Sequence, residues 1–393
     1  MKILFDVTAV QPSQGKFHGA SEYAKSLFER LMLNKKNQII ECVYNPDEWL
    51  DPVFAELMKV NSIVLHQART TVDIEKIISD GGYSLFYSAL PYRYYSNCFK
   101  CHSVFTVHGL RDLEMPSDSF EWRYSSGIIG LIKIMIKRFL PRFYMNIQLK
   151  RLAELVTGKN RNVRIITVSQ HSKYSLLSFL PELKSSDITV LYPPEKIIYS
   201  EAVNEDEVAR KFGIEPKHYY LIISANRWVK NSFRAMKALD SLYSTQNDFK
   251  CKTVVVGSGK KRLPRIKLKN RNMFIFTPYL SDAELDFMYR HAKALVYPTI
   301  NEGFGYPPVE AMRHGTPVLC SSIASTFEVC SNSVIYFNPF STDEIKNRLL
   351  MIDSDPDLRE KYSFLSLQRY REISHKQSDD LDRLCDIILG GKS

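Results

Sequence analysis

The sequence predicts an α/β protein built from two doubly wound domains with parallel sheets. Short apolar runs alternate with helical patterns along the whole chain, as expected where each strand is followed by a crossover helix. The 393 residues suit two domains better than one. Hydrophobic residues make up 45% and charged residues 24%, which excludes a disordered, collagenous or polytopic membrane chain.

The apolar runs have the length of buried strands. We expect strands near 2–7, 38–44, 62–66, 84–88, 103–107, 164–168 and 188–192 in the first half. In the second half we expect them near 219–224, 252–256, 273–276, 294–297, 317–320 and 334–337. The helix after Gly19 carries an apolar stripe with a 3.6-residue period, made of Ala20, Tyr23, Ala24, Leu27, Phe28 and Leu31. Such a stripe packs on a sheet.

Paired prolines, Pro193 and Pro194, mark the seam between the domains, because proline cannot continue a central strand. We therefore expect domains at 1–193 and 194–372, with a C-terminal helix in 373–393 that crosses back to the first domain. Open parallel sheets bind ligands at the carboxyl ends of their strands. Two facing domains would therefore enclose a small ligand in a cleft.

The sequence lacks the patterns of a membrane span, a signal peptide and a disulfide framework, and this bears on cellular location and cysteine chemistry. No run of 18 apolar residues occurs, and residues 1–7 look like a strand rather than a signal peptide, so we expect a cytoplasmic protein. Seven scattered cysteines form no disulfide framework. The pattern C-x-x-C-H at 98–102 is typical of haem attachment and D-x-D at 353–355 of metal binding. We interpret both as structural and expect no metal.

The charge balance favours anionic partners. There are 53 basic and 43 acidic residues, a net charge of +10, which leaves nucleic acid, acidic lipid and phosphorylated ligands open. Segments 122–152 and 258–278 each carry seven basic residues and no acidic one. Within the first, residues 127–140 contain nine large apolar residues and three cations. They fit an interfacial helix on an anionic membrane, or equally a first-domain helix that buries its apolar side.

The strongest functional signal lies at 297–317. A strand ends at Pro298, a glycine loop follows, and a helix begins at Pro307 or Pro308, where proline suits the first turn. A loop and first helical turn of this kind form a nest for an anion. Two carboxylates, Glu302 and Glu310, flank the nest; they would repel a bare phosphate but accept hydrogen bonds from hydroxyls. The pattern indicates a phosphate flanked by sugars.

This motif is also where the chain resembles a known family. Glu302-x7-Glu310 with Gly-Phe-Gly between, followed by Glu-Ala-Met and Gly-Thr-Pro-Val, resembles the retaining glycosyltransferases of family 4, which have the GT-B fold. Segments 168–173, 279–285 and 327–329 resemble further parts of that family. The resemblance implies an acceptor domain at 1–193 and a nucleotide-sugar donor domain at 194–372.

The resemblance also implies roles for the carboxylates and the glycine loop. Glu302 matches the carboxylate that holds the hydroxyls of the donor sugar, and Glu310 the one on the nucleotide ribose. Backbone amides would come from Gly303, Phe304 and Gly305. Four more residues are expected to line the donor site: Gly19, which opens the first helix, Tyr279, Leu280 and Tyr306. The second glycine often found after Gly19 is here Ala20.

Cations and one histidine complete the expected site. Arg227 and Lys230 resemble the pair that grips the diphosphate in that family. The spacing between them is shorter than usual there, so Lys230 is the preferred assignment. Fixed cations would carry the charge of the leaving diphosphate where metal-dependent enzymes use an ion. Asn231 is expected to cap the next helix. His108, at a strand end, matches the histidine beside the reacting sugar.

The expected function is therefore transfer of a hexose, mannose or similar, from a nucleotide-diphosphate sugar, with retention and without metal or other cofactor. The acceptor would be a hydroxyl of a glycan or polyprenyl-linked molecule in bacterial surface polysaccharide or lipopolysaccharide synthesis. Segment 127–151 would contact the inner face of the cytoplasmic membrane. The alternatives are a GT-B nucleotide-sugar epimerase and a non-catalytic nucleotide- or nucleic-acid-binding protein, although no aromatic and basic strand motif of the RNA-reading kind occurs.

Overall fold

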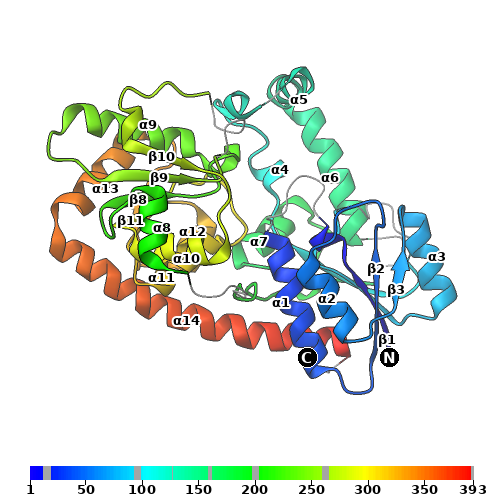
Figure 1. The fold of residues 1–393 in the computed structure, drawn as a ribbon. Helices are drawn as coiled ribbons and strands as arrows, with labels where there is room; N and C mark the ends of the chain where they lie inside the picture. Colours follow the sequence, from blue (N-terminus) through cyan, green and yellow to red (C-terminus); the bar gives the residue numbers. More distant parts are fainter. Residues whose placement is uncertain are drawn as a thin grey trace. The chain divides into compact units, whose positions relative to one another are not determined.

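The structure, a computed structural model, describes residues 1–11, 19–92, 99–125, 127–157, 162–196, 203–258 and 265–390 (Figure 1). The chain forms two compact units. Unit 1 comprises Met1–Leu113, Arg142–Ile197 and Ser374–Ser393; unit 2 comprises Glu114–Pro141 and Ile198–Ile373. The segment from Glu114 to Pro141, which the sequence boundary at 193 assigned to the first domain, thus clusters with unit 2.

Unit 1 is built on a parallel sheet. Its described strands are β1 (Lys2–Asp6), β2 (Ile39–Tyr44), β3 (Leu65–Gln67), β4 (Leu85–Ser88), β5 (His102–Val107), β6 (Val163–Thr167) and β7 (Ile188–Val190). They lie in the order β3-β2-β1-β4-β5-β6-β7. The order reverses between β1 and β4, the switch point at which doubly wound sheets bind ligands.

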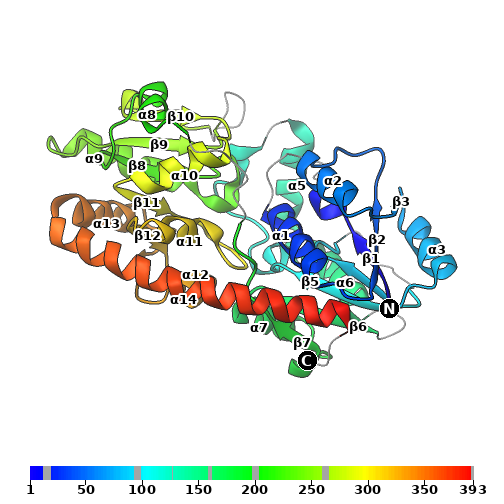
Figure 2. The ribbon, with the colours of Figure 1, turned by 60° about the horizontal axis from the view of Figure 1, so that its bottom comes forward.

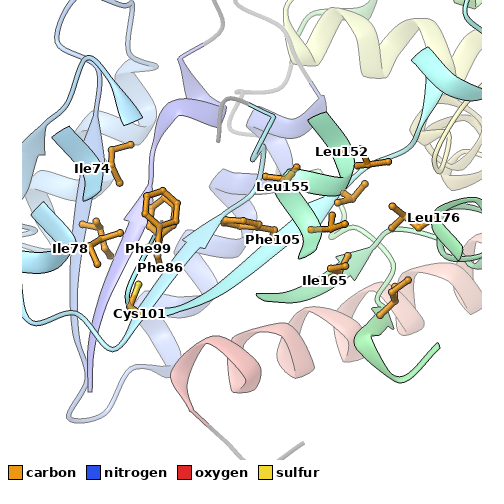
Figure 3. Close-up of a cluster of buried hydrophobic side chains, with 14 of the residues drawn as sticks. Ile74, Ile78, Phe86, Phe99, Cys101, Phe105, Leu152, Leu155, Ile165 and Leu176 are labelled. Atoms are coloured by element: carbon orange, nitrogen blue, oxygen red, sulfur yellow. The ribbon is translucent and has the colours of Figure 1, made fainter. Parts of the chain in front are cut away.

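Helices cover both faces of this sheet, and its strands are therefore apolar on both sides. The helices are α1 (Gly19–Asn34), α2 (Pro52–Val60), α3 (Thr71–Gly81), α6 (Pro141–Thr157) and α7 (Gln170–Phe179), with the short α4 (Arg111–Glu114) and the 3₁₀ turns η1 (Thr8–Val10) and η3 (Ser185–Asp187). On one face, Phe86 and Phe105 contact side chains of α3, α6 and α7 (Figure 3). On the other face, Phe5 packs edge-to-face against Phe28 of α1, with ring centroids 5.2 Å apart.

Unit 2 has a second parallel sheet. Its described strands are β8 (Tyr219–Ile222), β9 (Lys252–Val256), β10 (Phe274–Thr277), β11 (Ala294–Tyr297), β12 (Val318–Ser321) and β13 (Ile335–Phe337). Their order is β10-β9-β8-β11-β12-β13, so the switch point lies between β8 and β11.

The helices of unit 2 are α5 (Ile128–Phe139), α8 (Glu205–Phe212), α9 (Ser232–Thr245), α10 (Asp282–His291), α11 (Tyr306–Arg313), α12 (Ala324–Cys330), α13 (Thr342–Ser354) and α14 (Pro356–Leu389), with the 3₁₀ turns η2 (Glu121–Tyr124), η4 (Trp228–Lys230) and η5 (Arg271–Met273). A core of Ile222, Val296 and Leu319 packs beneath α9 and α13. From Ser374 on, the residues of α14 cluster with unit 1.

The strands and the fold class agree with the sequence predictions, with β3 beginning three residues late. The six residues of the predicted stripe on α1 are buried. The final helix differs, because it is one uninterrupted helix of 34 residues that starts at Pro356 (Figure 2). Proline is well suited to this first helical position. Cys98 of the C-x-x-C-H pattern and the basic triplet 260–262 lie outside the described residues.

Candidate active site

Two loops of unit 2 lie beside each other at the switch point of the second sheet. One follows β8 and contains Arg227 and Lys230; the other follows β11 and contains Glu302. β8 and β11 are hydrogen-bonded neighbours in parallel, so their carboxyl ends share one edge of the sheet. The topology therefore brings the predicted cation loop and the predicted carboxylate loop together.

A buried ion pair joins the two loops. The ammonium of Lys230 lies 2.6 Å from Oε1 of Glu302, and the side chains are only 8% and 17% exposed. Lys230 also donates to the hydroxyl of Tyr297, at 3.0 Å. The hydroxyl of Thr299 donates to the same carboxylate oxygen, at 2.8 Å. The last residue of β11 and the loop after it thus hold the pair in place.

The electrostatics of the pair follow from its burial. Burial lowers the pKa of Lys230, and the attraction of Glu302 offsets only part of this effect. Burial would raise the pKa of Glu302, but the charge and hydrogen bond of Lys230 outweigh it, so the pKa of this carboxyl is lowered. Glu302 is therefore ionised at neutral pH, and Lys230 is its counter-charge.

The glycine loop ends in a residue that needs glycine. Gly305 has a φ of +100°, a backbone conformation that L side chains rarely adopt, and it occupies the N-cap position of α11. The helix begins at Tyr306, one residue earlier than predicted. Pro307 and Pro308 follow at once and carry no N–H. Amide donors at this end must therefore come from Gly303 to Tyr306 and not from a full first helical turn.

The second carboxylate of the motif is held by a tyrosine of α10. The hydroxyl of Tyr289 donates to Oε2 of Glu310 at 2.7 Å. Burial raises the pKa of Tyr289 well above its usual value, and the charge of Glu310 adds to the effect. The phenol is therefore a permanent donor to this carboxylate.

The remaining predicted donor-site residues of unit 2 differ in exposure. Arg227 and Tyr279 are exposed, and the hydroxyl of Tyr279 donates to Oδ1 of Asn226 at 3.2 Å. Leu280 and Phe304 are buried. Phe304 packs edge-to-face on Tyr306, with ring centroids 5.6 Å apart.

Asn231 occupies the predicted N-cap position of α9, but its side chain does not cap the helix. It has a left-handed backbone, with φ 55° and ψ 26°. Its amide donates to the carbonyl oxygens of Pro298 and Pro339, each at 2.8 Å. The prediction of a capping side chain was wrong, because the two carbonyls, after β11 and β13, orient the side-chain amide and its Oδ1, the atom that would cap the helix, accepts from Nη1 of Arg234 instead.

The two predicted residues of the first half lie in unit 1. Gly19 is the first residue of α1. His108 follows β5, with Nε2 2.8 Å from the carbonyl oxygen of Ala89. The acceptor is a carbonyl, so Nε2 carries the proton. The imidazole packs edge-to-face on Tyr23 of α1, with centroids 5.0 Å apart.

The D-x-D pattern has structural partners. Asp353 forms an ion pair with Lys293 at 2.5 Å and accepts from the hydroxyl of Tyr220 at 2.6 Å. Asp355 accepts from the backbone N–H of Leu358 in the first turn of α14. Across the described ranges, no three His, Cys, Asp or Glu side chains are grouped so that they could hold a metal ion. In the same part of the chain, no helix is long and apolar enough to cross a membrane.

Sequence reasoning assigned no role to several residues that hold the site. Tyr297, Thr299 and Tyr289 all support a predicted carboxylate or cation. Tyr297 ends a buried strand, and a residue with an apolar body and a polar tip at that place is a usable signal. The contacts of Thr299 and Tyr289 depend on the tertiary structure, and no spacing reveals them.

The two doubly wound parallel sheets, with a buried cation–carboxylate pair at the switch point of the second, define a two-domain α/β protein of the GT-B type. Residues 204–364 match the family of glycosyl transferases group 1. The match lies within unit 2 and agrees with the resemblance to family 4.

Curated relatives support the same class. The chain is 27% identical over 268 residues to the O-antigen chain mannosyltransferase RfbU of Salmonella typhimurium. This alignment covers 67% of this chain and 64% of the relative. It is 27% identical over 269 residues to the serotype-specific mannosyltransferase WbdA of Escherichia coli, covering 62% of this chain and 31% of the relative. The matches thus span less than two thirds of these relatives.

Solved structures share the fold over the whole chain. Anabaena HepE, solved in complex with UDP and glucose, aligns with a TM-score of 0.65 at 15% identity. The alignment covers 99% of each chain. WaaG, a glycosyltransferase involved in lipopolysaccharide biosynthesis, has a TM-score of 0.64 at 14% identity and covers 99% of this chain and all of its own. At such identities the likeness shows the GT-B fold. The two curated relatives are described as mannosyltransferases, so the comparisons do not support the alternatives of an epimerase or a nucleic-acid-binding protein.

Proposed function

We propose that the protein is a retaining glycosyltransferase that moves a hexose, mannose or a similar sugar, from a nucleotide-diphosphate sugar to a hydroxyl of a glycan or polyprenyl-linked acceptor. The observation that carries the proposal is the buried Lys230–Glu302 pair at the carboxyl ends of β8 and β11. Similarity to two O-antigen or serotype-specific mannosyltransferases supports mannose and a place in bacterial surface polysaccharide synthesis.

Lys230 would contact the diphosphate of the donor. Its ammonium is buried and held by Tyr297 and Glu302, so little reorganisation is needed when negative charge develops on the leaving group. Arg227, exposed on the same loop, would close on the outer phosphate as a second cation. The amides of residues 303–306 would complete the anion site.

The carboxylates would hold hydroxyls. Lys230 and Thr299 donate to Oε1 of Glu302, and we propose that Oε2 accepts from hydroxyls of the donor sugar. Glu310, fixed by Tyr289, would accept from the ribose hydroxyls. A charged acceptor in a buried site discriminates strongly for a ligand that can donate to it.

Four further residues are assigned to the site from the resemblance to family 4. In unit 1, the imidazole of His108 would bind a hydroxyl near the reacting carbon, and the loop at Gly19 would contact the donor phosphate or the acceptor. In unit 2, Tyr279 and Leu280 follow β10 and would border the nucleotide.

The reaction needs no protein base in this proposal. The bond between the anomeric carbon and the diphosphate oxygen breaks, and the acceptor oxygen bonds to the same face of that carbon. The acceptor proton passes to the departing diphosphate oxygen. The products are a glycoside of unchanged anomeric configuration and a nucleoside diphosphate.

We propose that fixed cations make the reaction independent of divalent metal. Treatment with EDTA, followed by removal of the chelate, is expected to leave the transfer rate unchanged. Loss of activity that magnesium or manganese restores would contradict this part of the proposal.

A membrane surface is the proposed location of the acceptor. Among the described residues of α5, none is buried; Ile128, Ile129 and Phe139 are 77%, 73% and 73% exposed. The helix (Figure 1) carries Lys133, Lys137 and Arg138 and no acidic residue. An exposed apolar side with adjacent cations is typical of helices that lie on anionic headgroups. We propose that α5 holds the enzyme at the inner face of the cytoplasmic membrane.

The test is a panel of nucleotide-sugars with the purified protein and a polyprenyl-linked glycan acceptor. We expect nucleoside diphosphate release that depends on acceptor, strongest with a mannosyl donor, and a product whose anomeric proton coupling matches the donor. A product with the opposite anomeric configuration would overturn retention. No turnover with any donor, in protein that is folded, would overturn the proposed function.

A further inference from the structure

A segment from the first half of the sequence supports the candidate site. Residues 114–125 belong to unit 2 and contact the two loops that carry Lys230 and Glu302. Three side chains anchor this segment: Asp118 and Tyr124 reach the first turn of α9, and Glu114 reaches the loop after β11.

The central anchor is a buried ion pair. The guanidinium of Arg234, in the first turn of α9, binds the carboxylate of Asp118 in a bidentate manner, at 2.9 and 3.2 Å. The side chains are only 7% and 9% exposed. The guanidinium also lies over the rings of Phe120 and Phe340, at 4.5 and 5.2 Å from their centroids. Such a pair fixes the geometry of both partners.

The same guanidinium continues the chain of contacts to Lys230. Nη1 of Arg234 donates to Oδ1 of Asn231 at 2.8 Å. This fixes the amide of Asn231, which then holds the carbonyl oxygens of Pro298 and Pro339. Asn231 directly follows Lys230, and Pro298 directly precedes Thr299, a donor to Glu302. Asp118 is thus linked through two side chains to both loops of the ion pair.

The other two anchors act on the same elements. The hydroxyl of Tyr124 accepts from the N–H of Phe233 at 2.9 Å and lies 3.1 Å from Oγ of Ser232. Tyr124 therefore caps α9 in place of Asn231, whose amide is occupied. Glu114 accepts from the amide of Asn301, the residue before Glu302, at 2.6 Å.

We propose that Asp118 is a positioning residue for donor binding. It acts through Arg234 and Asn231 to hold Lys230 and Glu302 in their relative positions. This inference rests on the proposed function. Without Asp118, the guanidinium of Arg234 loses the partner that orients it toward Asn231, and the two loops lose a shared tether. Misplacement of a binding group by about 1 Å can cost on the order of 100-fold in rate.

The test compares Asp118→Asn, which keeps the size of the side chain, and Asp118→Ala with wild type. Titration calorimetry with GDP and with UDP measures the dissociation constant and the fraction of competent protein. We expect the dissociation constant and the donor KM to rise by about 10- to 100-fold in Asp118→Ala, less in Asp118→Asn, with unchanged stoichiometry and acceptor KM. Arg234→Lys, which cannot make the fork, should resemble Asp118→Ala.

The matched control is Asp353→Asn, which removes the negative charge from another buried ion pair of unit 2, the pair with Lys293. A general loss of stability would lower the competent fraction in both variants and leave the dissociation constant alone. If Asp118→Asn and Asp118→Ala both bind as tightly as wild type, or lose only competent fraction as the control does, the positioning role is refuted. A wild-type protein that binds neither GDP nor UDP and turns over no donor of the panel would overturn the proposed function and this inference with it.

Discussion

Tyr289 donates its hydroxyl proton to Oε2 of Glu310 at 2.7 Å, and both residues point from the helices α10 and α11 toward one another. The tyrosine is 2% exposed, and its raised pKa keeps the donor proton in place across the accessible pH range. Glu310 is thereby held as an acceptor before any ligand arrives.

The variant Tyr289→Phe should weaken donor binding. A hydrogen bond to a charged group contributes about 1.5–3 kcal/mol, which corresponds to roughly 10- to 100-fold in the donor KM. We expect kcat and the acceptor KM to change little. Steady-state kinetics with the preferred donor measures all three. Tyr219→Phe is the control, because the hydroxyl of Tyr219 is also buried but donates to the carbonyl of Met288. An equal KM effect in the control would refute the role of Glu310.

Removing one partner of the Lys230–Glu302 pair should destabilise the fold as well as abolish transfer. Lys230→Ala leaves a buried carboxylate without a counter-charge, which costs about 3–5 kcal/mol. The double variant Lys230→Met with Glu302→Gln is expected to recover most of this stability and none of the activity. Urea denaturation and a transfer assay check both statements. Near-normal turnover in either variant would show that the site is misassigned.

The pH dependence of activity should carry the signature of Lys230. Transfer requires its ammonium, and burial lowers the pKa of this residue, so activity is expected to fall as pH rises, earlier than an exposed lysine would cause. The unfolded chain holds this proton more tightly than the folded one, so this residue adds to the free energy of unfolding as pH rises in the same window. The loss of activity is therefore not loss of the fold.

Lys230→Arg tests this assignment, because a guanidinium stays protonated at any accessible pH. If kcat/KM for the donor is measured on the residual activity of Lys230→Arg, its fall at alkaline pH should occur at a higher pH than in wild type. An alkaline limb at the wild-type position would mean that another group controls it.

Binding of α5 to anionic vesicles should depend on its exposed cations. Lys133→Glu with Arg138→Glu is expected to weaken sedimentation with phosphatidylglycerol vesicles, and added salt should weaken it in wild type. Lys137 is left unchanged because it forms an ion pair with Glu121 at 3.2 Å, and its replacement would disturb η2. Lys36→Glu with Lys59→Glu, on exposed positions of unit 1, makes the same charge change. Equal binding by both double variants would exclude α5 as the membrane contact.

The strands and the switch-point loops could be predicted from the sequence because each is a local pattern. Buried parallel strands are continuous apolar runs, and the turn after β11 is marked by Gly305 and two prolines. The segment at 114–125 could not be assigned to unit 2, since its contacts with Arg234 and Phe233 lie more than 100 positions away in the sequence. The charge of Asp118 gives no indication of its partner.

The site was predictable as residue types and not as geometry. Lys230 and Glu302 were expected near one ligand, but their direct contact at 2.6 Å follows from the adjacency of β8 and β11. Asn231 shows the limit most clearly. Its residue type fits an N-cap, yet two carbonyls from distant loops determine where its amide points.

The backbone and the amide of Asn231 together restrict what evolution can place there. Glycine would accept the left-handed conformation but leave two buried carbonyls without donors. Aspartate has nearly the same shape but would set its charge against those carbonyls and lose both bonds. Few substitutions of Asn231 can therefore be tolerated, although its side chain need not contact the sugar.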